Sequence, residues 1–278
     1  MPIACIGSVA HVSLWEVRSW EEHRAWALGR WAGSVLGNDA VIVATVLADL
    51  RMHPTCYLLN PTNVDVRHVA ERVGPHNVVA VDEEPGELTR SLCLEDHTGR
   101  RTWVFSRVPK SPADLGRVRE SFVYADYYTE FIGVLNSNLY RLSGSSDRLV
   151  LNVSAVLDLN ANIRLPFRPT VLQASVGTAV SIDDATAYAT RLVTSTEAQR
   201  VFVTMGSRGA VLATSNGCWH SVPHTQMSES VLGAGAIFSS QVIRGLVDDL
   251  DGEVLLQRSV ECTAEYLERW VMNECDRH

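Results

Sequence analysis

Short apolar runs bounded by turn residues alternate along the chain with longer segments of helical periodicity. This alternation is typical of repeated strand–helix–strand units. We expect strands at residues 3–6, 55–59, 78–81, 91–95, 101–106, 122–127, 149–152, 170–173, 201–205, 210–214 and 218–222, and helices at 39–50, 64–73, 183–194, 236–250 and 253–275. Asn63 is the expected N-cap of the second helix. The pattern therefore predicts an α/β fold with a central, mostly parallel sheet.

The segment from Trp15 to Trp31 interrupts this rhythm. Trp15, Trp20, Trp26 and Trp31 lie among charged residues at spacings of five and six, which suit neither a helical stripe nor a clean strand. An aromatic contact surface, for a ligand lid or for a dimer partner, is one interpretation. Ordinary packing inside a small subdomain is the other, and the sequence leaves both open.

Length and composition indicate one large globular domain. The chain has 278 residues, of which 46% are hydrophobic and 20% charged, as is typical of globular proteins. The net charge of -8 and the absence of a basic block argue against nucleic acid or an anionic membrane as the partner. No stretch reaches the roughly 20 apolar residues of a membrane span. The six cysteines form no C-x-x-C pair, so we expect reduced thiols in a cytoplasmic protein.

Two glycine-containing segments in the last third carry the candidate chemistry. The first is a V-T-x-G-x-x-G run whose marked residues are Thr204, Gly206 and Gly209, and the second is the turn Gly233, Ala234 and Gly235. A Gly-Ala-Gly turn at a helix start frees backbone N–H groups to face an anion, and the helix dipole adds partial positive charge there. Taken alone, such a turn also fits mere close packing of a helix on a strand.

Together, these segments resemble the ribokinase, or PfkB, family of carbohydrate and nucleoside kinases, in which V-T-x-G-x-x-G precedes D-T-x-G-A-G-D-x-F. The resemblance implies a three-layer α/β/α ribokinase-like fold with a central mostly parallel sheet and a small β-rich lid. It implies a single domain over residues 1–278, with lid segments at about 12–36 and 88–110. It also implies nucleotide binding at Thr204, Gly206 and Gly209, and phosphate binding at the Gly233–Gly235 turn.

The chain departs from the family where the kinase reaction needs specific groups. Ala236 stands at the position of the family's general base, and an alanine cannot accept a proton, so the catalytic residue is unknown. Ser175 and Thr178 stand where the family's K-P-N-x-x-E motif has Asn and Glu, and neutral hydroxyls are poor Mg²⁺ ligands. We therefore expect no metal site in the protein, and weakened or lost binding of ATP and Mg²⁺.

The substrate-pocket positions that the resemblance marks are His11, Val12, Gly37, Asn38 and Ile42. Val12 and Ile42 are apolar where the family binds sugar hydroxyls, and hydroxyls in a desolvated site need paired donors and acceptors. We expect a ligand that differs from ribose. His11 follows the first strand and is a candidate to face the substrate cleft.

Three functions remain open at this point. The first is a pseudokinase that binds a phosphorylated, nucleoside-like or sugar-like small molecule, with kinase activity lost or repurposed. The second is a working transferase, an ATP-dependent sugar or nucleoside kinase with a non-standard base. The third is a structural or regulatory partner protein that uses its tryptophan-rich segment. The resemblance also implies a homodimer formed through the lid.

Overall fold

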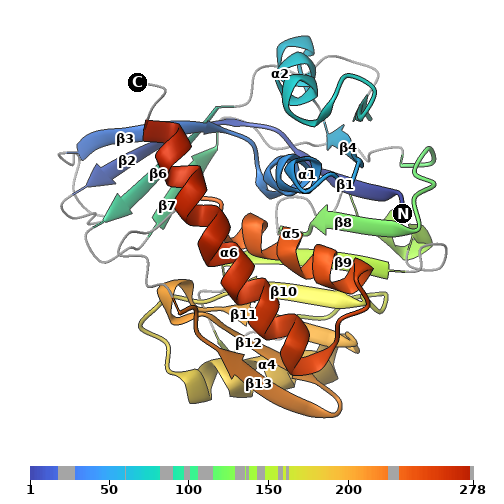
Figure 1. The fold of residues 1–278 in the computed structure, drawn as a ribbon, viewed down its shortest axis with the longest axis vertical. Helices are drawn as coiled ribbons and strands as arrows, with labels where there is room; N and C mark the ends of the chain where they lie inside the picture. Colours follow the sequence, from blue (N-terminus) through green and yellow to red (C-terminus); the bar gives the residue numbers. More distant parts are fainter. Residues whose placement is uncertain are drawn as a thin grey trace.

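The main body is a nine-stranded sheet in the order β13-β12-β11-β10-β9-β8-β1-β4-β5 (Figure 1). The computed structural model describes residues 1–17, 29–59, 61–81, 90–96, 101–105, 115–128, 135, 138–142, 148–155, 159–160, 163–224 and 232–275. The strands are β1 (Ile3–Ser8), β4 (Pro54–Leu59), β5 (Val78–Ala80), β8 (Phe122–Asp126), β9 (Arg148–Ala155), β10 (Val171–Ser175), β11 (Arg200–Thr204), β12 (Ala210–Thr214) and β13 (Gly217–Ser221). Pairing is parallel from β5 to β11 and antiparallel at β12 and β13.

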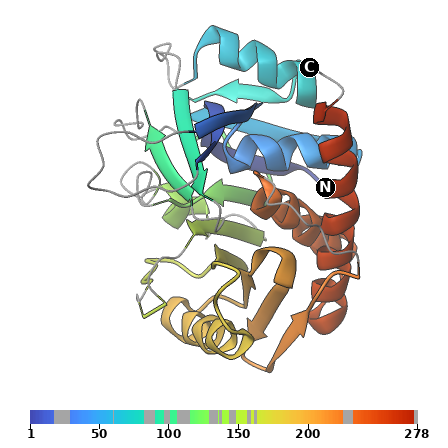
Figure 2. The same cartoon turned by 90° about the vertical axis from the view of Figure 1, so that its left-hand side faces the viewer.

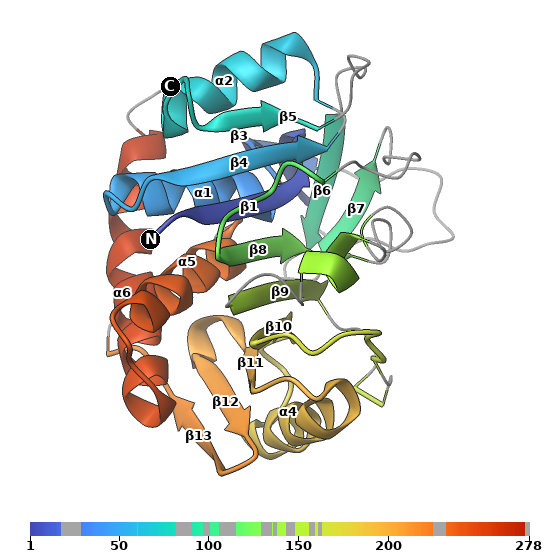
Figure 3. The same cartoon turned by 90° about the vertical axis from the view of Figure 1, so that its right-hand side faces the viewer.

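Helices cover both faces of this sheet, as Figures 1 and 3 show. One face carries α1 (Asp39–Asp49), α2 (Asn63–Val73), α5 (Ala234–Val247) and α6 (Gly252–Cys275), and the other carries α4 (Ile182–Thr196). The predicted three-layer α/β/α fold with a mostly parallel sheet is confirmed.

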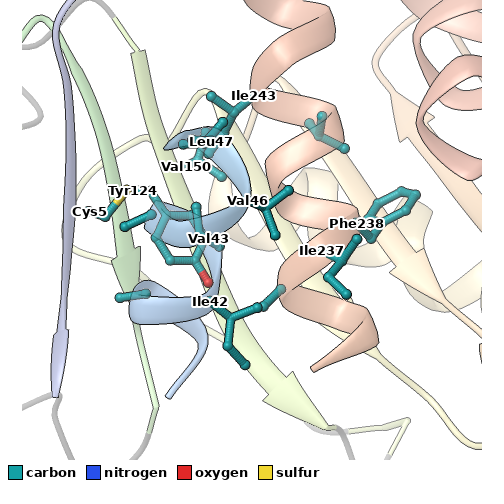
Figure 4. Packing of buried hydrophobic residues seen from close by; sticks show 14 of the residues in the cluster. Cys5, Ile42, Val43, Val46, Leu47, Tyr124, Val150, Ile237, Phe238 and Ile243 are labelled. Atoms are coloured by element: carbon teal, nitrogen blue, oxygen red, sulfur yellow. The ribbon is translucent and has the colours of Figure 1, made fainter. Parts of the chain in front are cut away.

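Burial on both faces explains why the strands read as continuous apolar runs. In β1, Ile3 and Cys5 belong to the apolar cluster that contains residues of α1 and α5, while Ala4 and Ile6 belong to the cluster on the opposite face, which also contains residues of α4. Parallel strands covered on both sides have this composition because neither face meets water. In Figure 4, side chains of α1 point toward α5, so that the two helices share one apolar layer.

The N-terminus of α2 corrects one prediction, since its N-cap is Thr62 and not Asn63. Thr62 Oγ1 accepts from the backbone N–H of Asp65 at 3.1 Å, and Asp65 Oδ2 accepts from the Thr62 N–H at 2.8 Å. This reciprocal pair needs a carboxylate three residues after the cap. Thr62 is followed three residues later by the carboxylate of Asp65, whereas Asn63 is followed at that distance by Val66.

A second sheet of four strands, in the order β3-β2-β6-β7, stands beside the main sheet (Figure 2). Its strands are β2 (His11–Val17), β3 (Gly29–Leu36), β6 (Arg90–Asp96) and β7 (Arg101–Phe105). The predicted hairpin at 91–106 is present as β6 and β7, while its turn at 97–100 lies outside the described residues. We call this sheet the lid sheet.

Trp15 and Trp31 are partners in the lid sheet, where they pair across β2 and β3. The prediction that their segment suits no clean strand is wrong at both ends. Their linear spacing was uninformative because the two residues lie on different strands, and the register shifts at a bulge after Leu14. Trp20 and Trp26 lie outside the described residues.

Two further features concern the chain as a whole. Within the described ranges, no helix has the length and apolar character needed to cross a membrane.

Cys5, Cys56 and Cys93 are buried free thiols. Burial raises the thiol pKa of Cys5 and of Cys56 well above the ordinary value for cysteine.

Candidate functional site

A row of buried polar side chains crosses three neighbouring strands, at the carboxyl end of one and two or three residues before the carboxyl ends of the other two. Asp126 of β8, Asn152 of β9 and Gln173 of β10 are paired in register across the sheet, and their exposed fractions are 0%, 2% and 1%. We call these three residues the polar row. In open parallel sheets ligands bind outside the carboxyl ends of the strands, so the row marks the edge where a site is expected.

The N-terminal turn of α5 is anchored to this row. Gln173 Nε2 donates to the Gly235 carbonyl at 2.9 Å, and Ser239 Oγ donates to Gln173 Oε1 at 2.5 Å. Gly233 is the N-cap, with a φ of 87°, and no side chain caps the helix there. Among the described residues, which leave out 225–231, no side chain accepts from the first N–H groups of α5, and Gln173 fixes the Gly235 carbonyl of this turn.

The two glycine segments meet at this edge. A Cβ built on Gly235 would lie 3.6 Å from Gln173 Nε2 and 3.7 Å from Ser175 Oγ, so the turn faces the end of β10. Ser175 Oγ in turn lies 2.8 Å from Thr204 Oγ1 at the end of β11. The structure therefore brings Thr204 and the Gly233–Gly235 turn together through Ser175.

Gly206 and Gly209 have conformational roles of their own. Gly206 has a φ of 58°, and a Cβ there would lie 2.9 Å from Thr178 Cγ2. Gly209 has a φ of 81°, and its Cβ would lie 1.9 Å from the Ser221 carbonyl oxygen on β13. L-residues rarely adopt such angles. Both glycines are thus required by the backbone, whatever else they contact.

Ala236 is completely buried and belongs to the apolar core between α1, α5 and the sheet. Ile42 of α1 lies beside the turn, since its Cδ1 would be 2.8 Å from a Cβ built on Gly233. Figure 4 shows Ile42 near the start of α5. The position that the sequence resemblance assigns to the family's base thus holds a buried methyl group, flanked by another apolar side chain.

The N-terminus of α1 reaches the same edge. Gly37 has a φ of 145° and donates its N–H to the Ala10 carbonyl at 2.9 Å, which fixes the entry to the helix. Asn38 Nδ2 donates to Ser8 Oγ at the end of β1. Asp39 Oδ2 accepts from Asn152 Nδ2 at 2.7 Å and from the Tyr128 hydroxyl. The polar row therefore supports α1 as well as α5.

Asp126 is the most unusual member of the row because it is a carboxyl group with no exposed surface. Its Oδ2 accepts from the Ala40 N–H at 3.0 Å and its Oδ1 from the Tyr124 hydroxyl at 3.1 Å. Burial, and then the charge of Asp39, raise the pKa of Asp126 well above its ordinary value, and the two hydrogen bonds offset this only in part. Burial and both aspartates also raise the pKa of Tyr124.

His11 and Val12 lie at the start of the lid sheet and face different neighbours. His11 Nε2 lies 3.2 Å from Asp65 Oδ1, so its ring points toward the start of α2. Val12 is buried in a cluster with Ala10 and Cys93, and Leu232, the residue before the Gly233 turn, packs against this cluster. The lid sheet thus contacts the turn through apolar side chains. Among the described residues, no group of three or more His, Cys, Asp or Glu could hold a metal ion.

Sequence reasoning missed Asp39 and the whole polar row. A signal was present, because the runs F-V-Y-A-D, L-V-L-N and V-L-Q each reach a polar residue two positions after a core residue. Period-two alternation puts that polar side chain on the same sheet face as the core residue. The α5 side of the site was found through its glycines, and the resemblance marked Gly37, Asn38 and Ile42 on the α1 side, but neither signal extended to Asp39 or the polar row.

No protein-family model and no curated protein matches the sequence. Solved structures match over almost the whole length. Ribokinase from Thermotoga maritima has 12% identity and a TM-score of 0.61, over 94% of this chain and 90% of that one. Phosphofructokinase-2 from Escherichia coli in complex with fructose-6-phosphate has 18% identity and a TM-score of 0.61, over 94% and 91%.

A second structure of that enzyme, in complex with substrates and products, has 15% identity and a TM-score of 0.61, over 99% of both chains. The chain has the ribokinase-like fold. At these identities the likeness concerns the fold. Within this fold, the edge described above is where α1, α5 and the lid sheet meet.

Proposed function

We propose that this protein binds a phosphorylated, nucleoside-like or sugar-like small molecule at the carboxyl edge of the sheet, and that ordinary phosphoryl transfer is lost. The phosphate would lie on the Gly233–Gly235 turn, where the first N–H groups donate to no described side chain and, with the dipole of α5, favour an anion. The observation that carries the proposal is Ala236, a buried methyl group directly after that turn. A general base contributes roughly 10²–10⁴-fold to rate, so its absence disables transfer more than binding.

The solved neighbours support the ligand class. They include a ribokinase and a phosphofructokinase in complex with fructose-6-phosphate. For this chain we propose weak Mg²⁺ and ATP binding, because Ser175 and Thr178 offer neutral hydroxyls. The apolar contacts of Val12 and Ile42 beside the turn favour a ligand with fewer hydroxyls than ribose.

The sharpest test of the binding site is Gly235→Ala. The added methyl group meets only ordinary contacts with Gln173 and Ser175, and alanine inside a helix stabilises it by about 0.5–1 kcal/mol relative to glycine. We therefore expect a slightly higher Tm. Because the methyl group stands on the side of the turn that faces the end of β10, where the phosphate is proposed to lie, we also expect weaker binding of fructose-6-phosphate and ATP in isothermal titration calorimetry. Gly177→Ala is the matched control, because nothing lies within 4 Å of a Cβ there. Equal affinities in Gly235→Ala and wild type would contradict this site.

Turnover is tested with ATP, Mg²⁺ and a panel of sugars and nucleosides. We expect no transfer at rates ordinary for kinases. A second candidate function, an active kinase with a non-standard base, is favoured by one observation: the carboxylate of Asp39 lies at the N-terminus of α1, on the same edge as the turn. Rapid transfer that is lost in Asp39→Asn would establish this second function in place of the first.

We also propose a homodimer through the lid sheet. Trp15, Trp31 and Val104 are 37%, 45% and 52% exposed. Trp15 is paired with Trp31 and with Leu94, so large apolar side chains lie side by side across three strands. Analytical ultracentrifugation of wild type and of Trp15→Ser/Trp31→Ser tests the proposal. A monomeric wild type would contradict it.

A further inference from the structure

The N-terminus of helix α1 is capped by a side chain from strand β8, which is distant in the sequence. Asn38 occupies the N-cap position, yet its side chain makes no capping bond and instead donates to Ser8. The backbone N–H of Ala40, in the first turn, donates to Asp126 Oδ2 at 3.0 Å. The N–H groups of a first turn have no partner within the helix, and one acceptor there stabilises it. Asp126 thus performs the task that a local N-cap side chain usually performs.

The chain is shaped to admit this contact. A Cβ on Gly7 would lie 2.4 Å from Asp126 Oδ2 and 2.6 Å from the Ala40 Cβ, so only glycine fits between the carboxyl group and the helix. The other oxygen of Asp126 accepts from Tyr124, and the residue has no exposed surface. Asp126 therefore cannot touch a ligand, and any effect of it on ligand binding passes through its hydrogen-bond partners, the Ala40 N–H and the Tyr124 hydroxyl.

Those groups lead to Asp39 at the edge of the sheet. The Tyr124 hydroxyl accepts from Asn152 Nδ2 at 3.3 Å, and the same Nδ2 donates to Asp39 Oδ2 at 2.7 Å. Asp39 is only partly buried, whereas Asp126 and Asn152 are inaccessible. The hydrogen-bonded series from Asp126 to Asp39 therefore fixes both the backbone and the first side chain of α1.

We propose that Asp126 is a positioning residue, which caps α1 from β8 and thereby holds Asn38 and Asp39 at the ligand-binding edge. This inference rests on the proposed function for its effect on a ligand, but its structural half is independent. A neutral carboxyl group can fill this role, since Asp126 Oδ2 has only to accept the Ala40 N–H and the residue has no exposed surface.

The electrostatic surroundings agree with a neutral Asp126. Its pKa is raised by burial and by Asp39, so Asp126 and Asp39 together hold one proton more readily than two separate carboxyl groups would. The titratable groups around it are Asp39 from α1, Tyr124 and Tyr128 from the end of β8, Cys5 from β1 and Cys56 from β4. None of these groups carries a positive charge that would attract the charged form of Asp126, and the hydrogen bonds from Tyr124 and the Ala40 N–H, which favour that form, offset burial only in part.

The test compares Asp126→Asn with Asp126→Ala by hydrogen exchange of the peptide that covers residues 38–42. Asparagine keeps an acceptor for Ala40 and imitates a neutral carboxyl group, whereas alanine removes the cap. We expect Asp126→Ala to speed exchange in the first turn of α1 about tenfold, the size of one lost N-cap, and Asp126→Asn to stay near wild type. Ser181→Ala, which removes the local N-cap of α4, is the matched control and should speed exchange only at α4.

Binding of fructose-6-phosphate gives the functional half of the test. We expect Asp126→Ala to weaken binding and Asp126→Asn to restore it, a rescue that loss of general stability would not show. Unchanged exchange at 38–42 in Asp126→Ala, or fast exchange in both variants, overturns the inference. If wild type fails to bind any probe while the exchange result is as expected, the proposed function fails and the capping role stands.

Discussion

The substitution Ala236→Asp would restore the carboxylate that the resembled family has at this position, but we expect it to destabilise the fold because the position is buried. Ala236 has no exposed surface and packs in the core that contains Ile42, Ile237 and Phe238. A carboxyl group in such surroundings has its pKa raised by roughly 3 units, and each unit corresponds to about 1.4 kcal/mol. The penalty at neutral pH is therefore about 4 kcal/mol, of which the dipole of α5 returns at most about 2 kcal/mol. We expect a net loss of about 2–4 kcal/mol.

The sign of the pH dependence distinguishes this mechanism from simple overpacking. The introduced carboxyl group binds its proton more tightly in the folded than in the unfolded protein, so its cost is absent near pH 4. The cost grows as the pH rises and is complete above the raised folded pKa. Ala236→Asn adds similar volume without charge, and its cost should not vary with pH. Urea unfolding at pH 5 and pH 8 measures both variants. Equal losses at the two pH values in Ala236→Asp would show that the carboxylate reaches water, and would refute burial as the reason for the alanine.

Three further predictions concern Gly209, the α2 capping box and the buried carboxyl group of Asp126. Gly209→Ala should cost more than 2 kcal/mol in urea unfolding, because its Cβ would collide with the Ser221 carbonyl at 1.9 Å and the left-handed angle adds about 1–2 kcal/mol, whereas Gly177→Ala should cost little. Thr62→Ala should lower stability by about 1 kcal/mol through loss of the α2 capping box, and an unchanged midpoint would contradict that role. Stability of wild type should fall as pH rises from the ordinary carboxyl pKa through the raised pKa of Asp126, and Asp126→Asn should flatten this part of the profile in unfolding titrations from pH 4 to pH 8.

The sequence alone determined the layers of the fold and the α5 side of the site. Strands buried on both faces need unbroken apolar runs, and helices need their own periodicity, so both are visible in the local pattern. The turn Gly233–Gly235 and the run ending in Gly209 could also be identified from the sequence. Positive φ angles favour glycine, and glycines are evident in the sequence itself.

Only the tertiary structure decided what lies around that turn. Asp126, Asn152 and Gln173 come from three strands separated along the chain, and nothing local marks them as neighbours until the sheet pairs them in register. The same holds for Trp15 and Trp31, whose linear spacing concealed a cross-strand pair. Periodicity records the contacts of a residue with its own element, whereas a site at the edge of a parallel sheet is assembled from the ends of many elements.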